Sequence, residues 1–475
     1  MSRAVTEVEK VYFSSLIFLF LYLPLVLGGY YLLPGKYRNF FLFAVNLFFY
    51  GWGEPRYILL MVFSMGSSWI FGWMIEKYRN RERVARGILV ISVAVSLGIL
   101  GFFKYSNFFL DMLREIPGFG GLPVLDVTLP IGISFYTFQT MSYTIDVYRR
   151  DTRAQRNFIS YGTYVSFFPQ LIAGPIVRYR DVAEQLENRR ENPLQFADGI
   201  GLFTVGMAKK VLLANQFGVL WDTLRQCGEQ GGILGAWLGA VAFMFQIYFD
   251  FSGYSDMARG LGKMFGFEFL ENFNFPYIAQ SITDFWRRWH ISLSTWFRDY
   301  VYIPLGGNRK GNMRTLLNLL AVWLLTGLWH GANFNFVLWG LYYFVLLVLE
   351  KLFLGGVIKR CPRGIRHIYA LFFVLIGWVI FYFEDFGQMA GYLGQMFTLR
   401  NGILGVGAKT AVLSYLPLLC IGTLACLPVW KKRYAEFRQK KGIWILETAV
   451  CLGVLLLCTA FLVSQSYNPF LYFRF

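Results

Sequence analysis

Two of the three histidines in the chain stand within aromatic and otherwise apolar sequence. His290 ends the run WRRWH, which starts at Trp286, and His330 lies in the run GLWHGANFNF. A neutral imidazole can take the proton from a hydroxyl as that hydroxyl attacks an activated carbonyl carbon. These two histidines are therefore the first candidates for chemistry, with His330 as the predicted general base.

The composition of the 475-residue chain is that of an integral membrane protein. Hydrophobic residues make up 56% and charged residues 15%, whereas a soluble domain has about 25% charged residues. The net charge of +17 comes from basic runs between apolar spans, which is typical of cytoplasmic loops rather than of a nucleic-acid site. The six cysteines form no CxxC pair, so neither a disulfide framework nor a metal site is predicted.

The apolar spans between the basic runs predict the fold, because a crossing helix needs about 20 apolar residues. We expect an all-α polytopic membrane bundle of about 11–13 transmembrane helices with re-entrant and interfacial helices, forming a single domain over 1–475 with both termini outside the cell. The candidate spans are 12–33, 40–54, 57–76, 87–103, 129–148, 196–221, 233–250, 315–350 (two segments), 368–383, 409–429 and 444–463.

Two regions break this pattern. Residues 158–175 are apolar but contain Pro169 and Pro175, which predicts an irregular or re-entrant segment. Residues 251–314 are predicted to form a cytoplasmic or re-entrant active-site segment. There, Ser281 and Asp284 resemble a capping box and start one amphipathic helix at the inner interface. Its apolar stripe consists of Ile282, Phe285, Trp286, Trp289, Leu293, Trp296 and Phe297.

Each histidine also has a structural interpretation. His290 falls on the buried stripe, where a hydrogen bond to a neighbouring helix would explain it. His330 follows a helix expected from Thr315, whose fifteen residues span only about 22 Å of a roughly 30 Å hydrocarbon core. That depth disfavours a charged imidazolium and marks a functional candidate, while a bridge between two helices is the alternative. Gly327 and Gly331 would thin the helix around it.

Basic side chains near His290 are candidates for binding the donor. Arg287, Arg288 and Arg298 can hold the phosphates of a nucleotide-based donor, and we add Trp286 and Asn333 as further donor-binding candidates. The alternative for each arginine is that it snorkels to lipid headgroups.

Three motifs resemble the membrane-bound O-acyltransferase (MBOAT) family and, within it, the bacterial alginate O-acetylation type. They are FFPQLIAGPIVR at 167–178, the stretch 249–309 that includes FDFSGYSD and FWRRWHISLSTWFRDYVYIPLGGNR, and GLWHGANFNFVLWG at 327–340. The resemblance extends from about Leu129 to the end of the sequence.

The resemblance implies a bowl-shaped helical bundle with a tunnel between a cytoplasmic donor site and an extracellular acceptor site. By position, His330 is the catalytic base, and His290 is the second histidine, which orients donor or acceptor. The implied donor is acetyl-CoA or another acyl thioester, with no bound cofactor. The implied partner is an extracellular SGNH- or esterase-like acyltransferase, the acceptor is an envelope polysaccharide or peptidoglycan, and the location is the bacterial cytoplasmic membrane.

The tail 464–475 is expected outside the cell. Similar envelope acylation systems use a C-terminal tyrosine as a temporary acyl carrier, and Tyr472 in FLYFRF fits that pattern. A phenol with a pKa of about 10 needs a base to become a nucleophile, and His330 would supply it. The alternative for the tail is an aromatic interfacial belt.

Two other functions compete with O-acetylation. A D-alanyl transferase for teichoic acids shares the FWRRWH-type and WHG-type motifs, although the GGNR turn at 306–309 and the tail on the same chain favour the acetylating group. A transporter or flippase for a lipid-linked precursor also has broken segments and polar groups within the membrane. The absence of internal sequence repeats argues against the transporter.

Overall fold

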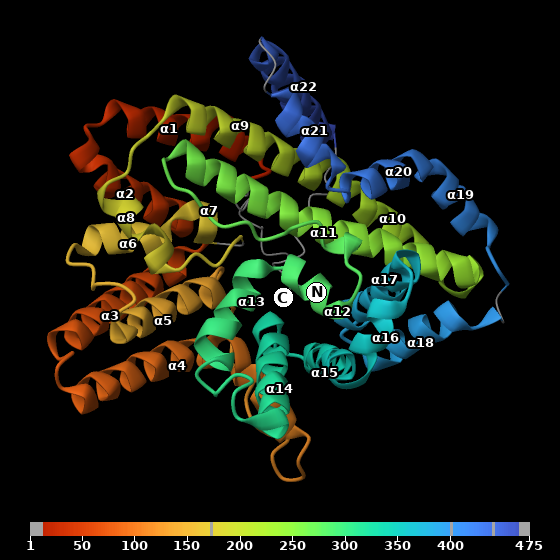
Figure 1. Cartoon of the computed structure of the whole chain (residues 1–475), viewed down its shortest axis with the longest axis horizontal. Helices are drawn as coiled ribbons and strands as arrows, with labels where there is room; N and C mark the ends of the chain where they lie inside the picture. The colour runs from red at the N-terminus through yellow and green to blue at the C-terminus, as the bar shows by residue number, and fades with distance from the viewer. Residues whose placement is uncertain (1–12, 172–173, 400–401, 439–441, 465–475) are drawn as a thin grey trace. The chain divides into compact units, whose positions relative to one another are not determined.

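The computed structural model describes residues 13–171, 174–399, 402–438 and 442–464. All regular secondary structure in these ranges is helical (Figure 1), as the composition predicted. The chain folds as two compact units: unit 1 comprises 1–203 and 256–270, and unit 2 comprises 204–255 and 271–475. This division leaves the predicted single domain a prediction.

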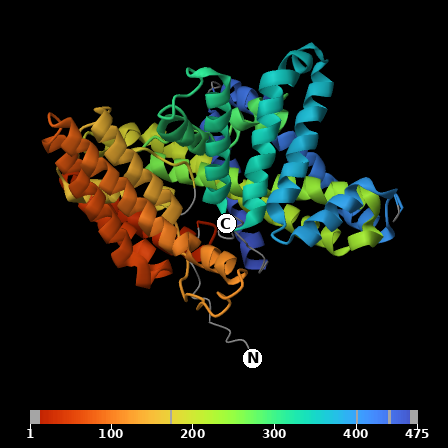
Figure 2. The ribbon, with the colours of Figure 1, turned by 90° about the horizontal axis from the view of Figure 1, so that it is seen from below.

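Unit 1 is built from the N-terminal helices. Figure 2 shows α3, α4 and α5 side by side, and these three helices contact one another. The helices of unit 1 are η1 (Phe18–Tyr22), α1 (Leu23–Leu32), α2 (Gly35–Gly53), η2 (Pro55–Tyr57), α3 (Ile58–Lys77), α4 (Glu82–Arg114), α5 (Ile133–Arg149), α6 (Phe158–Ser166), α7 (Phe168–Leu171), α8 (Tyr179–Glu187) and most of α9 (Pro193–Ala208).

The segment predicted to be irregular is broken as expected. Helix α6 ends at Ser166, and the four-residue helix α7 follows after Phe167. The side chain of Asn157 begins α6 by accepting hydrogen bonds from the backbone N–H groups of Ile159 and Ser160. The proline at position 169 lies inside α7, where the short helix has no preceding turn to lose.

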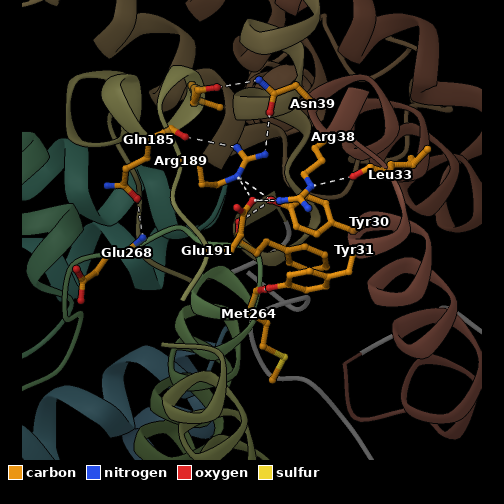
Figure 3. A network of polar contacts seen from close by, with 12 residues as sticks. Tyr30, Tyr31, Leu33, Arg38, Asn39, Gln185, Arg189, Glu191, Met264 and Glu268 are labelled. Carbon is orange, nitrogen blue, oxygen red and sulfur yellow. Dashed lines mark hydrogen bonds and ion pairs between the residues drawn. The ribbon is translucent and has the colours of Figure 1, made fainter. Parts of the chain in front are cut away.

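A network of ion pairs and hydrogen bonds ties distant segments of unit 1 together (Figure 3). Arg38 Nη1 lies 2.7 Å from Glu191 Oε1, and the hydroxyl of Tyr30 donates to the same oxygen at 2.6 Å. Arg189 donates to the Tyr30 hydroxyl at 2.8 Å and to the side-chain oxygen of Asn39 at 3.0 Å. The partly buried carboxylate is thereby neutralised and hydrogen-bonded, which is what its burial requires.

Unit 2 carries both candidate histidines. Its helices are η3 (Lys209–Ala214), α10 (Asn215–Gln226), η4 (Gly228–Gly231), the larger part of α11 (Gly232–Met264), η5 (Pro276–Ile278), α12 (Ile282–Arg288), α13 (Ile291–Phe297), η6 (Arg298–Tyr302), α14 (Gly311–His330), α15 (Phe334–Leu349), η7 (Glu350–Leu354), α16 (Gly355–Arg360), α17 (Arg363–Tyr382), α18 (Phe386–Phe397), α19 (Val406–Ser414), α20 (Leu416–Ala425), α21 (Val429–Phe437) and α22 (Ile443–Ser464).

Six helical segments among the described residues are long and apolar enough to cross a membrane, and the number is seven if the pair α19 and α20, bent by 57°, counts as one span. The six are Pro55–Lys77, Glu82–Arg114, Gly228–Met264, Phe334–Arg360, Arg363–Tyr382 and Ile443–Ser464. The described parts of the other predicted spans are also mainly helical, but no single helix there is both long enough and apolar enough to count as a crossing.

The predicted end of one span at residue 250 is wrong. Helix α11 continues to Met264 through Ser252, Ser255 and Asp256, which were predicted to belong to the segment 251–314. Asp250 accepts a hydrogen bond from Lys210 Nζ at 2.6 Å, and only 3% of either side chain is exposed. This carboxylate, at the predicted end of the span, is therefore buried with a cationic partner.

Candidate functional site

The stretch that contains His290 forms two short helices, so the predicted single helix is wrong. Helix α12 ends at Arg288, α13 begins at Ile291, and His290 between them has φ +45° and ψ +55°. This left-handed conformation costs a non-glycine residue about 1–2 kcal/mol. The chain therefore turns at the histidine, and the apolar stripe is nevertheless buried as predicted.

Two side chains hold the beginning of α12. Ser281 Oγ accepts from the backbone N–H of Asp284 at 3.0 Å, which confirms the predicted cap. The buried carboxylate of Glu350, at the end of α15, accepts from the backbone N–H groups of Ile282 at 2.6 Å and Thr283 at 2.9 Å. Since the first N–H groups of a helix lack intrahelical acceptors, Glu350 fixes α12 against α15.

His290 is buried, with 1% of its surface exposed. Its Nδ1 lies 3.2 Å from Asn272 Oδ1 and 3.5 Å from Ser292 Oγ. The ring of Phe251, from α11, packs in a T-shaped arrangement against the imidazole, with 4.8 Å between the ring centroids. Burial lowers the pKa of His290 to about 3, so the imidazole is neutral at physiological pH.

His330 is the last residue of α14, a helix that begins at Gly311, four residues before the expected start. Its ring packs edge-on against three aromatic rings, with centroid distances of 5.0 Å to Trp329, 5.1 Å to Trp339 and 5.2 Å to Phe381. These walls come from α14, α15 and α17, and 7% of His330 remains exposed. The predicted burial of His330 is confirmed.

Glycines allow α14 and α15 to approach closely around His330. A Cβ atom at Gly327 would lie 2.3 Å from the carbonyl oxygen of Phe336, and one at Gly340 would lie 2.4 Å from that of Trp323. The side-chain amide of Asn335 donates to the carbonyl of Phe381 at 3.0 Å, which links α15 to the end of α17. The aromatic walls of His330 are thus held by backbone contacts as well as by ring packing.

Trp329 joins the two histidines. Its ring centroid lies 5.8 Å from that of His290 and 5.0 Å from that of His330. The predicted site residue Trp286 belongs to the adjoining aromatic cluster. Its ring centroid lies 4.8 Å from that of Trp323 and 5.4 Å from that of Trp339. Two histidines that are 40 residues apart in sequence therefore lie against the indole of Trp329.

The donor-binding candidates differ in their surroundings. Arg288 donates to Asp284 at 2.8 Å, and Arg298, which is exposed, donates to the adjacent Asp299 at 2.8 Å. Arg287 is exposed and makes no ion pair within the described part of the chain. Asn333 caps α15 by accepting from the N–H of Asn335 at 3.4 Å.

Sequence reasoning missed three residues that position the site, and Tyr472 lies outside the described residues. Asn272 and Glu350 act through tertiary contacts that no local pattern announces. Lys210 stands out as a basic residue inside an apolar span, but its partner Asp250 is 40 residues away. Among the described residues, no group of three histidine, cysteine or acidic side chains could hold a metal ion.

Comparison with known proteins decides the family. The model of the membrane-bound O-acyltransferase family matches residues 147–387, which include both histidines and their aromatic walls. The chain belongs to this family. As an MBOAT protein it is a multi-pass membrane acyltransferase, and the resemblance seen in its motifs is confirmed.

Two relatives named for O-acetylation match nearly the whole chain, and a third relative matches about half of it. The probable alginate O-acetylase AlgI of Pseudomonas putida is 42% identical over 98% of this chain and 100% of the relative. The peptidoglycan O-acetyltransferase of Helicobacter pylori is 29% identical over 99% of both chains. The teichoic acid D-alanyltransferase of Bacillus subtilis is 30% identical, over 47% of this chain and 59% of the relative. This MBOAT protein is thus of the alginate O-acetylation type.

Proposed function

We propose that this acyltransferase moves an acetyl group from acetyl-CoA on the cytoplasmic side across the bacterial cell membrane, for O-acetylation of an extracellular polysaccharide or peptidoglycan. The observation that carries the proposal is the pair of buried histidines against Trp329. The match along the full length to proteins named for O-acetylation supports acetyl as the group transferred.

His330 is the general base of the proposed reaction. The imidazole takes the proton of the attacking hydroxyl as its oxygen bonds to the thioester carbonyl carbon. The carbon–sulfur bond then breaks, and the thiolate leaves as a thiol by taking a proton from the imidazolium. The aromatic walls of Trp339 and Phe381 favour the neutral, proton-accepting ring before the reaction.

The donor's phosphates are proposed to bind Arg287, Arg288 and Arg298, and Trp286 and Asn333 are proposed as further donor contacts. Of the three arginines, Arg287 is the one whose guanidinium is not engaged by a carboxylate within the described residues, so we assign it the main phosphate contact. Arg288 contributes less, because Asp284 already holds it.

We further propose that Tyr472 carries the acyl group after it leaves coenzyme A, and that an extracellular SGNH- or esterase-like partner passes it to the polymer. Tyr472→Phe removes the hydroxyl that would form the ester and should abolish polymer acetylation. Tyr467→Phe is the matched control, since it removes a hydroxyl from the same tail. Full polymer acetylation by Tyr472→Phe would exclude the carrier role.

Purified protein in vesicles, incubated with radiolabelled acetyl-CoA, tests the proposed function. We expect label on the protein or on an added acceptor and release of free coenzyme A. The D-alanyl transferase match over about half the chain makes D-alanyl transfer to teichoic acid the second candidate. Labelling by a D-alanyl carrier-protein thioester, with none from acetyl-CoA, would favour that candidate. Membership of an acyltransferase family removes the transporter as an interpretation.

A further inference from the structure

We infer that Asn272 is a positioning residue that holds His290 as the tautomer protonated on Nδ1, so that Nε2 is a hydrogen-bond acceptor. The inference rests on the proposed function only in taking His290 as part of the acyl-transfer site. The direction of the hydrogen bond between Asn272 and His290 decides what His290 can do to a substrate.

Asn272 makes a clamp around the residues that follow the histidine. Its backbone carbonyl accepts from the N–H of Ile291 at 2.9 Å. Its side-chain oxygen accepts from the N–H of Ser292 at 3.1 Å and from the Ser292 hydroxyl at 2.9 Å, and lies 3.2 Å from His290 Nδ1. All of these contacts lie within unit 2, and Asn272 is buried.

The contacts of Asn272 show which of its side-chain atoms is the oxygen and which nitrogen of His290 carries the proton. A backbone N–H can only donate, so the Asn272 atom that faces the N–H of Ser292 must be the amide oxygen and not the nitrogen. An amide oxygen can only accept, so its hydrogen bond with His290 requires a proton on Nδ1. A neutral imidazole carries one N–H, which leaves Nε2 without a proton.

The backbone of His290 explains why such a clamp is needed. The residue adopts the left-handed conformation between α12 and α13, with φ +45°. The two N–H groups that Asn272 binds, those of Ile291 and Ser292, are the first two of α13 and have no intrahelical acceptor. One residue therefore satisfies the helix start, supports the turn and orients the ring.

The tautomer limits the role of His290. An unprotonated Nε2 can accept a hydrogen bond from an O–H or N–H group of a substrate, such as the acceptor hydroxyl or a donor amide. It cannot donate to the oxyanion that develops on the thioester carbonyl. His290 is thus a residue that orients a substrate hydrogen-bond donor, and the oxyanion must be stabilised by another group.

Nitrogen NMR of the full-length protein, labelled with ¹⁵N-histidine and without substrate, tests the inference. The chain has only three histidines, and the His290→Gln variant assigns the signal. We expect His290 protonated on Nδ1 in the wild type, in Ser292→Ala, which keeps the backbone N–H, and in Asn272→Asp, which keeps an acceptor oxygen. We expect Asn272→Ala to lose this preference. A wild-type signal protonated on Nε2, or an unchanged tautomer in Asn272→Ala, would overturn the inference.

Kinetics give a second readout. By analogy with outer-shell partners of metal-bound histidines, Asn272→Ala should lower kcat about 10–100-fold, and Asn272→Asp should recover most of it. Asn274→Ala is the matched control, because Asn274 is exposed in the same loop and should keep wild-type kcat. A loss that Asn272→Asp does not rescue would mean a structural role alone. Since the NMR needs no acyl donor, failure of the proposed function would leave the tautomer result standing.

Discussion

Two regions of the molecule stabilise partly or fully buried polar side chains in different ways. In unit 1, Glu191 is surrounded by Arg38, Arg189 and the hydroxyl of Tyr30, so that charge meets opposite charge. In unit 2, His290 and His330 pack against aromatic rings, and His290 Nδ1 lies near the side-chain amide of Asn272 and the hydroxyl of Ser292. The first arrangement stabilises a charged carboxylate, whereas the second packs imidazoles against uncharged rings, and burial lowers the pKa of His290 to about 3.

The comparison predicts that the two regions fail differently when they are changed. Changes around Glu191 should lower the stability of the fold and leave the activity of folded molecules intact. Changes to the histidines should remove activity and leave stability nearly intact. His330→Gln and Glu191→Gln test this separation directly, while Gly327→Ala tests the packing around His330 and Arg287→Ala tests the proposed donor contact.

His330→Gln should give the largest effect. Glutamine keeps a side chain of similar size but cannot act as a base, so acyl transfer should fall by about 10²–10⁴-fold. Transfer of radiolabel from acetyl-CoA by purified protein measures the loss. His367→Gln, which changes the third histidine, is the control and should retain most of the activity. Equal losses in both variants would remove the special role of His330.

Gly327→Ala should affect both properties. The added Cβ would lie 2.3 Å from a backbone oxygen of α15, so the helices must separate, at a cost of about 1–3 kcal/mol in the free energy of unfolding. Thermal unfolding in detergent measures this cost, and activity should fall because the walls of His330 move. Gly391→Ala is the control, because nothing lies within 4 Å of a Cβ there. An unchanged unfolding temperature in Gly327→Ala would contradict the packing described.

Glu191→Gln should lower stability by about 1–2 kcal/mol at pH 7, a modest value because solvent partly screens the site. Burial alone would raise the pKa of Glu191, but hydrogen bonds from Tyr30 and Arg38 lower it overall. The carboxylate therefore stabilises the fold above its ordinary pKa of about 4.3, and this contribution is lost as the pH falls through the lowered value. The stability difference between wild type and variant should shrink in acid. A difference that grows in acid would show that the sign is wrong.

Arg287→Ala should give the smallest effect, a rise in KM for acetyl-CoA of roughly 3–10-fold with little change in kcat, as expected for one exposed charged contact. The rise should diminish at high salt. Arg288→Ala is the informative comparison, because it breaks the ion pair with Asp284. It should lower the free energy of unfolding more than Arg287→Ala does and raise the KM less. An unchanged KM in Arg287→Ala would leave the phosphate contact without support.

Much of the fold and part of the site could be predicted from sequence. Apolar length predicted the helices, the spacing of Phe285, Trp289 and Leu293 predicted the buried stripe, and Ser281 predicted the start of α12. These features depend on neighbours close in the chain, so local patterns report them.

The rest depends on partners far apart in the sequence. The turn at His290 is held by Asn272. The apolar stripe by itself favours a continuous helix, so it gives no sign of this contact. The burial of Asp250 in α11 depends on Lys210, which is 40 residues away in the sequence. Helical periodicity describes the face of one element, and it carries no information about which buried polar group will be matched by another element.

The role of His330 as the base is tested most directly by a single-turnover measurement of coenzyme A release from acetyl-CoA, with equal amounts of folded wild-type, His330→Gln and Glu191→Gln protein. We expect His330→Gln to lose the release step and Glu191→Gln to keep it at nearly the wild-type rate. Wild-type release by His330→Gln, or equal loss in the two variants, would contradict this role.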